Sequence, residues 1–272
     1  MRPRYLVAGL LGNDLVKSTC SLITFFKGKK MKKISLSLAM LGLLLGSSFL
    51  QAQDNDRSVI RIVNCSIDDG FTYDEVVERA RNNINWGENS PNAVFFRRPI
   101  YTSDEYQQNN DLMIAAYYSN HSEMVARRVA LGNDSRGNLP ITCSSPQVTR
   151  TYNVVGEAPS SEVTGMTTRF CALRDGASLS SAFSRISTVA GNYVSQGDDS
   201  LVQMNIPSLG GPANSPWDFV LSIVGSSLEG LTERMDMRLD GFRAEAGIGI
   251  EPSFSCDRPA MWATTRIYSA SN

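Results

Sequence analysis

His121 is the only histidine in the chain of 272 residues, and it stands in the segment YYSNHSEM. An imidazole titrates near neutral pH, so His121 could serve as a general acid or base or as an axial haem ligand. The same position, where an expected strand passes into an expected helix, also suits an ordinary residue of a first helical turn. His121 is therefore a candidate for acid/base or haem chemistry, with a purely structural role as the alternative.

Aromatic and polar side chains near His121 form a candidate ligand-binding group. Tyr117 and Tyr118 are consecutive in an expected strand, so they must face opposite sides of the sheet. The one that faces the helices could line a pocket, with polar help from Asn120 or His121, or it could simply pack in the core. Arg97, beside Arg98 on another expected strand, could bind an acidic ligand or pair with a surface carboxylate.

Other kinds of site find little support in the sequence. One histidine, together with cysteines that are expected to form disulfides, leaves no zinc or transition-metal ligand spacing. The Asp-Asp pairs at 68–69 and 198–199 fall in expected turns, where they suit solvated side chains better than acid/base chemistry. The segment SLGGPANSP lacks the lysine and the helix that follow a phosphate-binding loop. We expect no metal and no cofactor.

The segments CSIDDG at 65–70 and CALRDG at 171–176 point to an internal repeat. A shift of 106 residues without a gap superposes five identical pairs: Cys65 on Cys171, Asp69 on Asp175, Gly70 on Gly176, Arg79 on Arg185 and Glu123 on Glu229. The same shift sets Tyr117 against Ile223, Asn120 against Ser226 and His121 against Ser227. The repeat thus keeps structural residues and changes the polar candidates, which suggests that at most one half has a working site.

Each half predicts the element order βαββαβ. In the first half, strands are expected at 58–67, 92–102, 111–120 and 147–155, with helices at 72–87 and 121–132 and the polar loop SDEYQQNN at 103–110. In the second half, strands are expected at 167–173, 200–206, 217–225 and 263–269, with helices at 178–197 and 227–241. Thr72 suits a helix N-cap, and Gly70 suits a turn that needs a positive φ. Two tandem ferredoxin-like repeats follow from this order.

Four cysteines remain when residues 1–52 are set aside, and their number alone allows three pairings. In a βαββαβ unit the sheet order is 4-1-3-2, so the end of the first strand lies beside the start of the fourth. We therefore predict disulfides Cys65–Cys143 and Cys171–Cys256, one within each half. Each would close a loop of about 80 residues and stabilise its half by about 4 kcal/mol in the chain-entropy model.

Residues 31–52 have the features of a secretory signal peptide: Met-Lys-Lys, an apolar run and cleavage after Ala52. Residues 1–30 fit an upstream extension from a misplaced start codon. The remainder carries 18 basic and 26 acidic residues, a net charge of −8, because eight of the 26 basic and one of the 27 acidic residues precede Gln53. An acidic body argues against nucleic acid or an anionic membrane as a partner. We expect a periplasmic or secreted protein without membrane insertion, divided as 1–30, 31–52, 57–156 and 157–272.

The duplicated strand, Asp-Gly turn and helix, in βαββαβ order, resemble the dimeric α+β barrel superfamily, and within it exported tandem proteins related to antibiotic-biosynthesis monooxygenases. The resemblance covers residues 57–272. It implies an α+β fold in which the two sheets pack into a barrel within a monomer, with a pocket between each sheet and its helices. It also implies a range of activities, from cofactor-independent oxygenation and haem breakdown to binding alone.

Three functions are therefore open. A small-molecule-binding or interaction module, for an apolar or aromatic ligand, fits the lack of an acid/base constellation and is the reading that we favour over an enzyme. A cofactor-independent monooxygenase would need only a shaped apolar pocket with a few polar groups. A haem-handling protein would place His121 on the iron.

Overall fold

A computed structural model describes residues 57–131, 138–211, 215–237 and 253–270. They belong to one compact unit, Asp54–Asn272. The expected upstream extension at 1–30 and signal peptide at 31–52 lie outside the described residues, so both stay predictions. In the described part of the chain, no helix is both long and apolar enough to span a membrane.

The elements of the first half follow the expected order with additions. They are β1 (Arg57–Ile67), α2 (Tyr73–Asn83), β2 (Ala93–Tyr101), α3 (Asp104–Asn109), β3 (Leu112–Tyr118), α4 (His121–Leu131), β4 (Ile141–Cys143) and β5 (Gln147–Val155). The segment predicted as the loop 103–110 is largely the short helix α3, because Ser103 caps it by accepting from the Tyr106 amide. Helix α2 ends at Asn83, before the expected Gly87, because Ile84 returns to an extended conformation.

The second half has β6 (Val163–Leu173), α5 (Leu179–Val194), β7 (Leu201–Leu209), β8 (Phe219–Val224), α6 (Leu228–Met237), β9 (Phe254–Cys256) and β10 (Ala260–Ser269). The short strands β4 and β9 were missed by the sequence analysis because three residues are too few to show a period. Gly70 and Gly176 both have positive φ, 87° and 78°, in the turn before α2 and α5. Thr72 and Ser178 then cap these helices with capping boxes.

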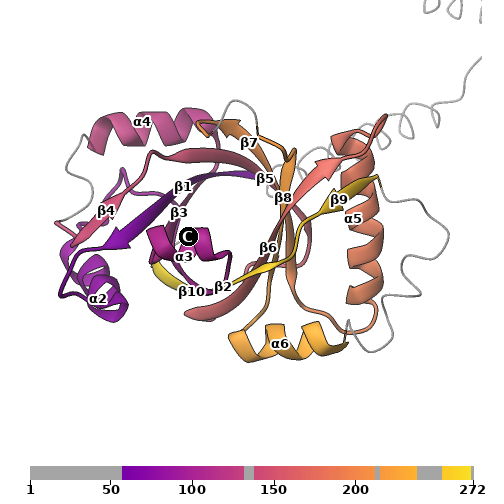
Figure 1. Cartoon of the computed structure of the whole chain (residues 1–272). Helices are drawn as coiled ribbons and strands as arrows, with labels where there is room; N and C mark the ends of the chain where they lie inside the picture. Colours follow the sequence, from indigo (N-terminus) through magenta and orange to yellow (C-terminus); the bar gives the residue numbers. More distant parts are fainter. Residues whose placement is uncertain (1–56, 132–137, 212–214, 238–252, 271–272) are drawn as a thin grey trace, which may run out of the picture. The chain divides into compact units, whose positions relative to one another are not determined.

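Eight strands close into an antiparallel barrel (Figure 1). The first half contributes β2-β3-β1-β5 and the second contributes β7-β8-β6-β10, so each half has the expected order of its four long strands. The two sheets join edge to edge, through β5–β7 on one side and β10–β2 on the other. This closed barrel is the architecture that the resemblance implies. Backbone hydrogen bonds along both seams leave no free edge among these eight strands.

The strand registers correct the gapless alignment of the two halves. Cys65 pairs with Leu112 across β1 and β3, whereas Cys171 pairs with Phe219 across β6 and β8. Because these two offsets differ by one residue, β3 corresponds to β8 with a shift of 107. Tyr117 therefore corresponds to Val224, not Ile223, and His121 corresponds to Leu228, not Ser227. A one-residue slip in a strand turns each side chain to the other face, so the expected pairs at these positions were wrong.

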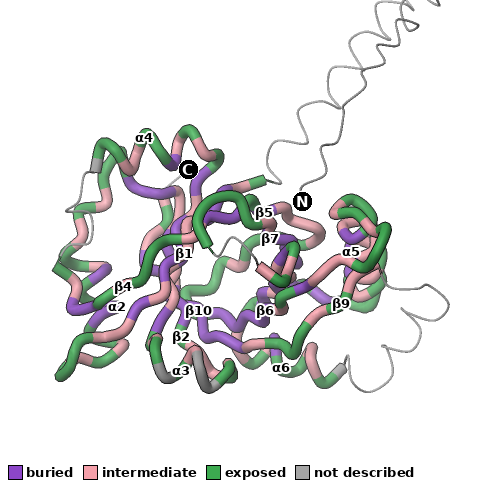
Figure 2. Tube along the Cα trace, turned by 45° about the horizontal axis from the view of Figure 1, so that its top comes forward, coloured by how far each residue is buried: buried purple, intermediate pink, exposed green. Residues whose placement is uncertain are grey.

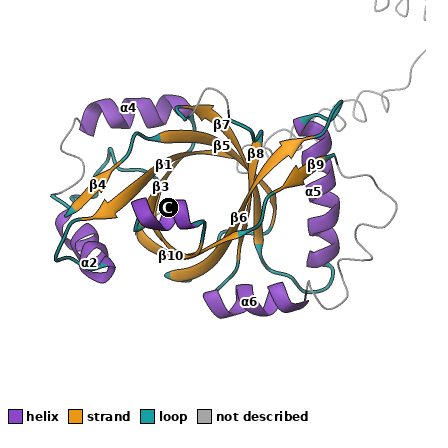
Figure 3. Cartoon of the chain, viewed as in Figure 1, coloured by secondary structure: helices purple, strands orange, loops and turns teal. Residues whose placement is uncertain are grey.

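Two layers of side chains line the barrel wall. The outward face packs against α2, α4, α5 and α6, which lie outside the ring of strands (Figure 3), and forms one apolar cluster in each half. Figure 2 shows that the buried parts of the chain follow the strands, while the helices are exposed over much of their length. The inward face is unusually polar. Thr149, Thr151, Gln203, Asn205 and Ser222 are each no more than 5% exposed there.

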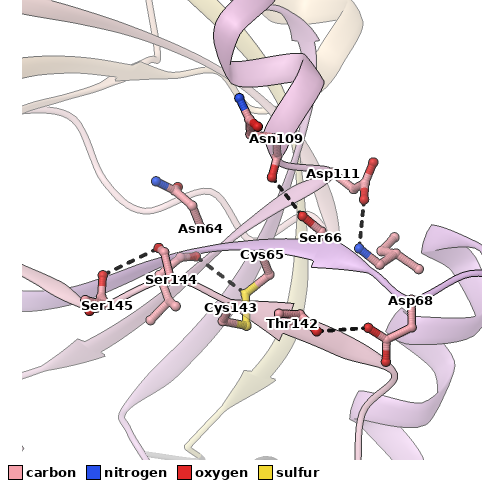
Figure 4. The surroundings of a disulfide bond; sticks show 12 residues. Asn64, Cys65, Ser66, Asp68, Asn109, Asp111, Thr142, Cys143, Ser144 and Ser145 are labelled. Atoms are coloured by element: carbon pink, nitrogen blue, oxygen red, sulfur yellow. Dashed lines mark hydrogen bonds between the residues drawn. A yellow bond between two sulfur atoms is a disulfide. The ribbon is translucent and has the colours of Figure 1, made fainter.

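Both predicted disulfides form. Cys65 bonds to Cys143 and Cys171 bonds to Cys256, each linking a long first strand to the short strand that precedes the fourth. Around the first disulfide, Thr142 donates to Asp68 at 3.2 Å (Figure 4). The Ser144 amide donates to the Asn64 carbonyl at 2.9 Å. The bridge and these hydrogen bonds fix β4 against the end of β1.

Candidate ligand-binding site

A cavity of about 430 Å³ lies in the first half, between the outward face of the sheet and the segments that cover it. Its floor comes from alternate residues of three strands, and its cover comes from the end of α2, from α4 and from residues 139–143. The apolar lining consists of Val63, Ile84, Trp86, Pro91, Val94, Phe96, Ile114, Ala116, Leu139 and Ile141. A largely apolar hollow of this size with a few polar groups is the usual form of a small-molecule site.

The cavity exists because the helix that covers this sheet is short. Helix α2 has 11 residues and buries only Val76, Val77 and Ala80. After Asn83 the chain leaves the helix and runs through Trp86 and Pro91 to β2, around the cavity instead of across it. Ala116, which is 6% exposed, adds a small side chain to the floor. The space above Ala116 is thus left unfilled by the protein.

Tyr118 provides a hydroxyl inside this apolar surface. Its side chain is 2% exposed and faces the helices. Burial raises the pKa of Tyr118 above its ordinary value, while the nearby guanidinium groups of Arg61 and Arg128 oppose that rise. The phenol is therefore neutral at physiological pH and can both donate and accept a hydrogen bond. Arg61 and Arg128 also line the cavity and give it positive charge.

Trp86 provides the second polar group. Its ring stacks on Tyr268, with the ring centroids 4.7 Å apart and the planes at 12°. The indole Nε1 is buried and has no hydrogen-bond partner in the described part of the chain. A buried donor without an acceptor costs free energy, which an acceptor on a bound molecule would recover. The lining of the cavity thus includes Trp86, whose buried indole donor has no acceptor, and Tyr118, whose hydroxyl can donate or accept.

The first disulfide contributes to the wall of this cavity. Cys143 and Ile141 of β4 line it, and β4 is held against β1 by the Cys65–Cys143 bond. On the opposite side, Arg127 donates to the Ser90 carbonyl and pairs with Glu123, so α4 is tied to the segment that carries Pro91. Two separate attachments therefore hold the cover in place.

The corresponding space in the second half is about 140 Å³. Helix α5 has 16 residues there and covers the sheet with Ala182, Ile186 and Ala190. Ile223, which occupies the place of Ala116 once the strand registers are aligned, fills more of the floor. The two halves share a strand order, but among the described residues only the first leaves room beneath its helices for a ligand of more than a few atoms.

The structure separates the residues that the sequence analysis grouped together. Tyr118 lines the cavity, and Tyr117 faces the barrel interior together with Arg97, to which it is hydrogen-bonded at 2.8 Å. This agrees with the expectation that the two tyrosines face opposite sides. Arg98 lies on the outward face, with its guanidinium 5.2 Å from the ring centroid of Tyr73.

Asn120 and His121 line neither the first-half cavity nor the barrel interior. The Asn120 side chain accepts from the Glu123 amide at 2.9 Å and so caps α4. His121 Nε2 is 3.0 Å from the Ser208 hydroxyl, which itself donates to the Val148 carbonyl. Because that hydroxyl has only one hydrogen, Nε2 must be the donor to Ser208. The structure thus gives both residues local partners and does not bring them to Tyr118.

Three residues of the cavity were missed by the sequence analysis. Trp86 was assigned to the expected helix 72–87, although the polar run around Asn82 and Asn83 is a signal that could have ended that helix earlier. Arg61 and Arg128 gave no signal, because they are far apart in the sequence and reach one cavity only in the folded chain. No cluster of three or more His, Cys, Asp or Glu side chains suited to a metal occurs among the described residues.

Comparison with known proteins adds a likeness of fold. No protein-family model matches the chain, and no curated protein matches it either. Among solved structures, it is similar to a "putative monooxygenase" from Lactobacillus acidophilus NCFM, with 9% identity over 78% of this chain and 95% of that one and a TM-score of 0.49. It is also similar to a mutant chlorite dismutase from Candidatus Nitrospira defluvii, with 9% identity, 77% and 92% coverage and a TM-score of 0.47.

Proposed function

We propose that this protein binds a small apolar or aromatic molecule in the cavity of its first half. The observation that carries the proposal is the difference between the halves: about 430 Å³ in the first and about 140 Å³ in the second, under the same strand order. A protein with a purely structural role would need no cavity, so both of its helix–sheet interfaces could be well filled. An open cavity loses packing contacts, so keeping one in a single half suits a binding role.

The lining indicates the kind of ligand. The floor of Phe96, Ile114 and Ala116 suits a flat apolar body. The unpartnered Nε1 of Trp86 requires an acceptor, and the Tyr118 hydroxyl can use either a donor or an acceptor. A bicyclic aromatic molecule with one hydroxyl or carbonyl group meets these requirements.

Isothermal titration with 1-naphthol tests this function. We expect saturable binding at one site, with a dissociation constant in the range of about 1–100 μM, and a change in the fluorescence of Trp86. Naphthalene, which lacks the oxygen, should bind about fivefold to tenfold more weakly because it leaves the indole donor unpaired. The absence of saturable binding by both compounds would reject the proposal.

Two enzymatic alternatives use the same fold and are separated by simple assays. A cofactor-independent monooxygenase would treat the cavity as an active site and would consume oxygen when given a naphthol or quinol. A haem-handling protein would give a Soret band on addition of haemin. His121 lies outside the lining of the cavity, so an iron bound there would need a different protein ligand. No observation favours either enzyme over binding alone.

We infer further that the chain is exported and built from two copies of one βαββαβ unit, 57–156 and 157–272. Two disulfides support export, because such bonds persist in oxidising compartments. The matching strand orders, caps and disulfides support the duplication. Sequencing the N-terminus of the exported protein tests the first point: a start near Gln53 is expected, and a start before Met31 would contradict it.

A further inference from the structure

A second cavity, of about 400 Å³, lies inside the barrel and is separate from the proposed site. It is lined at one end of the barrel by residues of all eight barrel strands, and by Ala158, Pro159 and Ser160 between β5 and β6. The other end of the barrel is covered by α3. There the Tyr106 ring packs edge-on against Trp262 at 5.1 Å, and the Tyr106 hydroxyl donates to Asn64 at 3.1 Å.

Arg97 is the central residue of this cavity. It lies on β2 in the middle of the barrel wall and is only 6% exposed. Its Nη2 donates to the Tyr117 hydroxyl at 2.8 Å, and its Nη1 lies 3.7 Å from the sulfur of Met113, a weak acceptor. Its Nε is buried and has no partner, and no ion pair joins Arg97 to a carboxylate of the described residues. A buried guanidinium is thus left with neutral partners.

The rest of the lining does not balance this charge. Arg57 and Arg266 also line the cavity, whereas no aspartate or glutamate is among its described lining residues. Arg266 is engaged by backbone carbonyls, since its Nη2 donates to Pro159 at 2.6 Å and to Ser161 at 3.0 Å. The Thr264 hydroxyl, which is also buried and lines the cavity, has no hydrogen-bond partner in the described part of the chain.

The second half replaces the cation at the matching position. Once the strand registers are aligned, Arg97 corresponds to Asn205, a neutral residue that also faces the interior. Asn205 accepts from Thr151 at 2.7 Å and donates to the Val220 carbonyl and to the Ser222 hydroxyl. The fold therefore satisfies a polar group at this position fully when it is only structural. Arg97 differs because it retains an unused donor and an unpaired charge.

An unpaired buried charge is costly, and the loss is recovered when an anion with good hydrogen-bond geometry meets it. We propose that the barrel interior is a binding site for a carboxylate-bearing small molecule, with Arg97 as its anchor. Nε–H and the second hydrogen of Nη2 form the planar fork that a carboxylate accepts in two parallel hydrogen bonds. Tyr117, which accepts from Arg97, keeps its own hydrogen to donate to the same anion.

The remaining walls suit the body of such a ligand. Phe95, Met166, Leu201 and Val224 present apolar surface to the cavity, and Gln203 and Asn153 are joined by a hydrogen bond of 2.9 Å at its edge. Phe95 packs edge-on against Tyr117, with the centroids 5.5 Å apart, so the aromatic surface lies next to the anchoring group. A compact aromatic or branched aliphatic acid fits this combination.

Titration calorimetry with benzoate and its uncharged counterpart benzamide tests the site. Benzoate should bind at least about tenfold more tightly than benzamide, because only the carboxylate meets the Arg97 fork. In Arg97→Gln this preference should disappear, and in Tyr117→Phe it should fall by about twofold to fivefold. Arg98→Gln is the matched control: it removes a neighbouring arginine from the outward face of the same strand and should leave the preference unchanged.

Thermal unfolding distinguishes a ligand anchor from a structural arginine. Without ligand, Arg97→Gln should unfold at the same temperature as the wild type or at a higher one, because it removes an unpaired buried charge. Benzoate should raise the unfolding temperature of the wild type and not that of the variant. Equal affinity for benzoate and benzamide, no saturable benzoate binding up to about 10 mM, or marked destabilisation of unliganded Arg97→Gln would each overturn the proposal.

The proposals for the first-half cavity and for the barrel interior can be rejected independently. Arg97→Gln should leave 1-naphthol binding as in the wild type, because Arg97 and the first-half cavity lie on opposite faces of the barrel wall. Loss of 1-naphthol binding with benzoate binding retained would reject the proposed function alone. The reverse result would reject the interior site alone.

Discussion

The two helix–sheet interfaces of this protein differ in how completely they are filled. In the second half, the 16 residues of α5 cover the sheet and leave about 140 Å³, whereas in the first half the 11 residues of α2 leave about 430 Å³. Strand order, helix caps and disulfides match between the halves. A binding cavity can thus arise from a change in helix length and one floor residue, while the scaffold stays the same.

Removing the disulfides should give the largest effect. Cys65→Ala with Cys143→Ala, and Cys171→Ala with Cys256→Ala, open loops whose cysteines are 78 and 85 residues apart. By the chain-entropy model each pair of changes should lower the free energy of unfolding by about 4 kcal/mol. Chemical denaturation checks this value.

The two pairs of cysteine substitutions should differ in their effect on 1-naphthol binding. Only the first pair of changes should also weaken 1-naphthol binding, because β4 forms part of the wall of the first-half cavity. Equal weakening by both pairs would show that binding responds to overall stability instead of to that wall.

Exchanging one floor residue should give the next largest effect. Ala116→Ile puts the second half's side chain into the first-half cavity and should reduce the affinity for 1-naphthol by more than about tenfold, since three added carbons occupy ligand space. Ile223→Ala is the reciprocal change and should leave that affinity unchanged while lowering stability by about 1–3 kcal/mol. Calorimetry and thermal unfolding check both. Unchanged binding in Ala116→Ile would contradict the assigned floor.

Tyr118→Phe should have a smaller effect. Loss of one neutral hydrogen bond should reduce the affinity for 1-naphthol by about 1 kcal/mol, with little change for naphthalene. His121→Ala, outside the cavity, serves as the comparison. A loss of about 1 kcal/mol is expected for this variant if His121 touches the ligand, whereas the hydrogen bond of His121 with Ser208 leads us to expect no change. Equal losses of affinity for 1-naphthol in the two variants would show that His121 also contacts the ligand.

The dependence of stability on pH should show the smallest effect. Burial raises the pKa of Tyr118 in the folded state, so its contribution to stability is fully present below the unfolded value of 10.0 and is lost as pH rises through the folded pKa. Stability from this group should be flat between pH 7 and 9 and should fall above pH 10. Denaturation curves of Tyr118→Phe should show a shallower fall. If the stability of the wild type begins to fall well below pH 9, ionisation of Tyr118 is not the cause of the fall.

Much of the fold could be predicted from the sequence because its signals are local. Alternating β-branched residues predicted β1, Thr72 predicted the cap of α2, and the 4-1-3-2 order predicted both disulfides. The correspondence between the residues of β3 and those of β8 could not be predicted, because an alignment of the two halves without gaps does not allow for a one-residue insertion in a loop. The short helix α3 was also missed, since its capping by Ser103 depends on how the chain turns after β2.

The candidate site could be predicted only in part. Alternation along β3 correctly placed Tyr117 and Tyr118 on opposite faces of the sheet. It could not show that Tyr118 lines one cavity with Trp86 and Arg128, because that arrangement depends on where α2 ends and how α4 packs. Arg97 and Tyr117 were proposed from their types, but their position on the inner wall of the barrel follows from closure of the sheet, which joins segments far apart in the chain.

A crystal structure with 4-bromo-1-naphthol tests the central claim most directly, because the anomalous signal of bromine locates the ligand in the protein. A single strong peak is expected in the first-half cavity, above Ala116 and within reach of Tyr118 and Trp86, and the peak should be absent in Ala116→Ile. A peak beneath α5 in the second half, or one inside the barrel that persists in Ala116→Ile, would contradict the account.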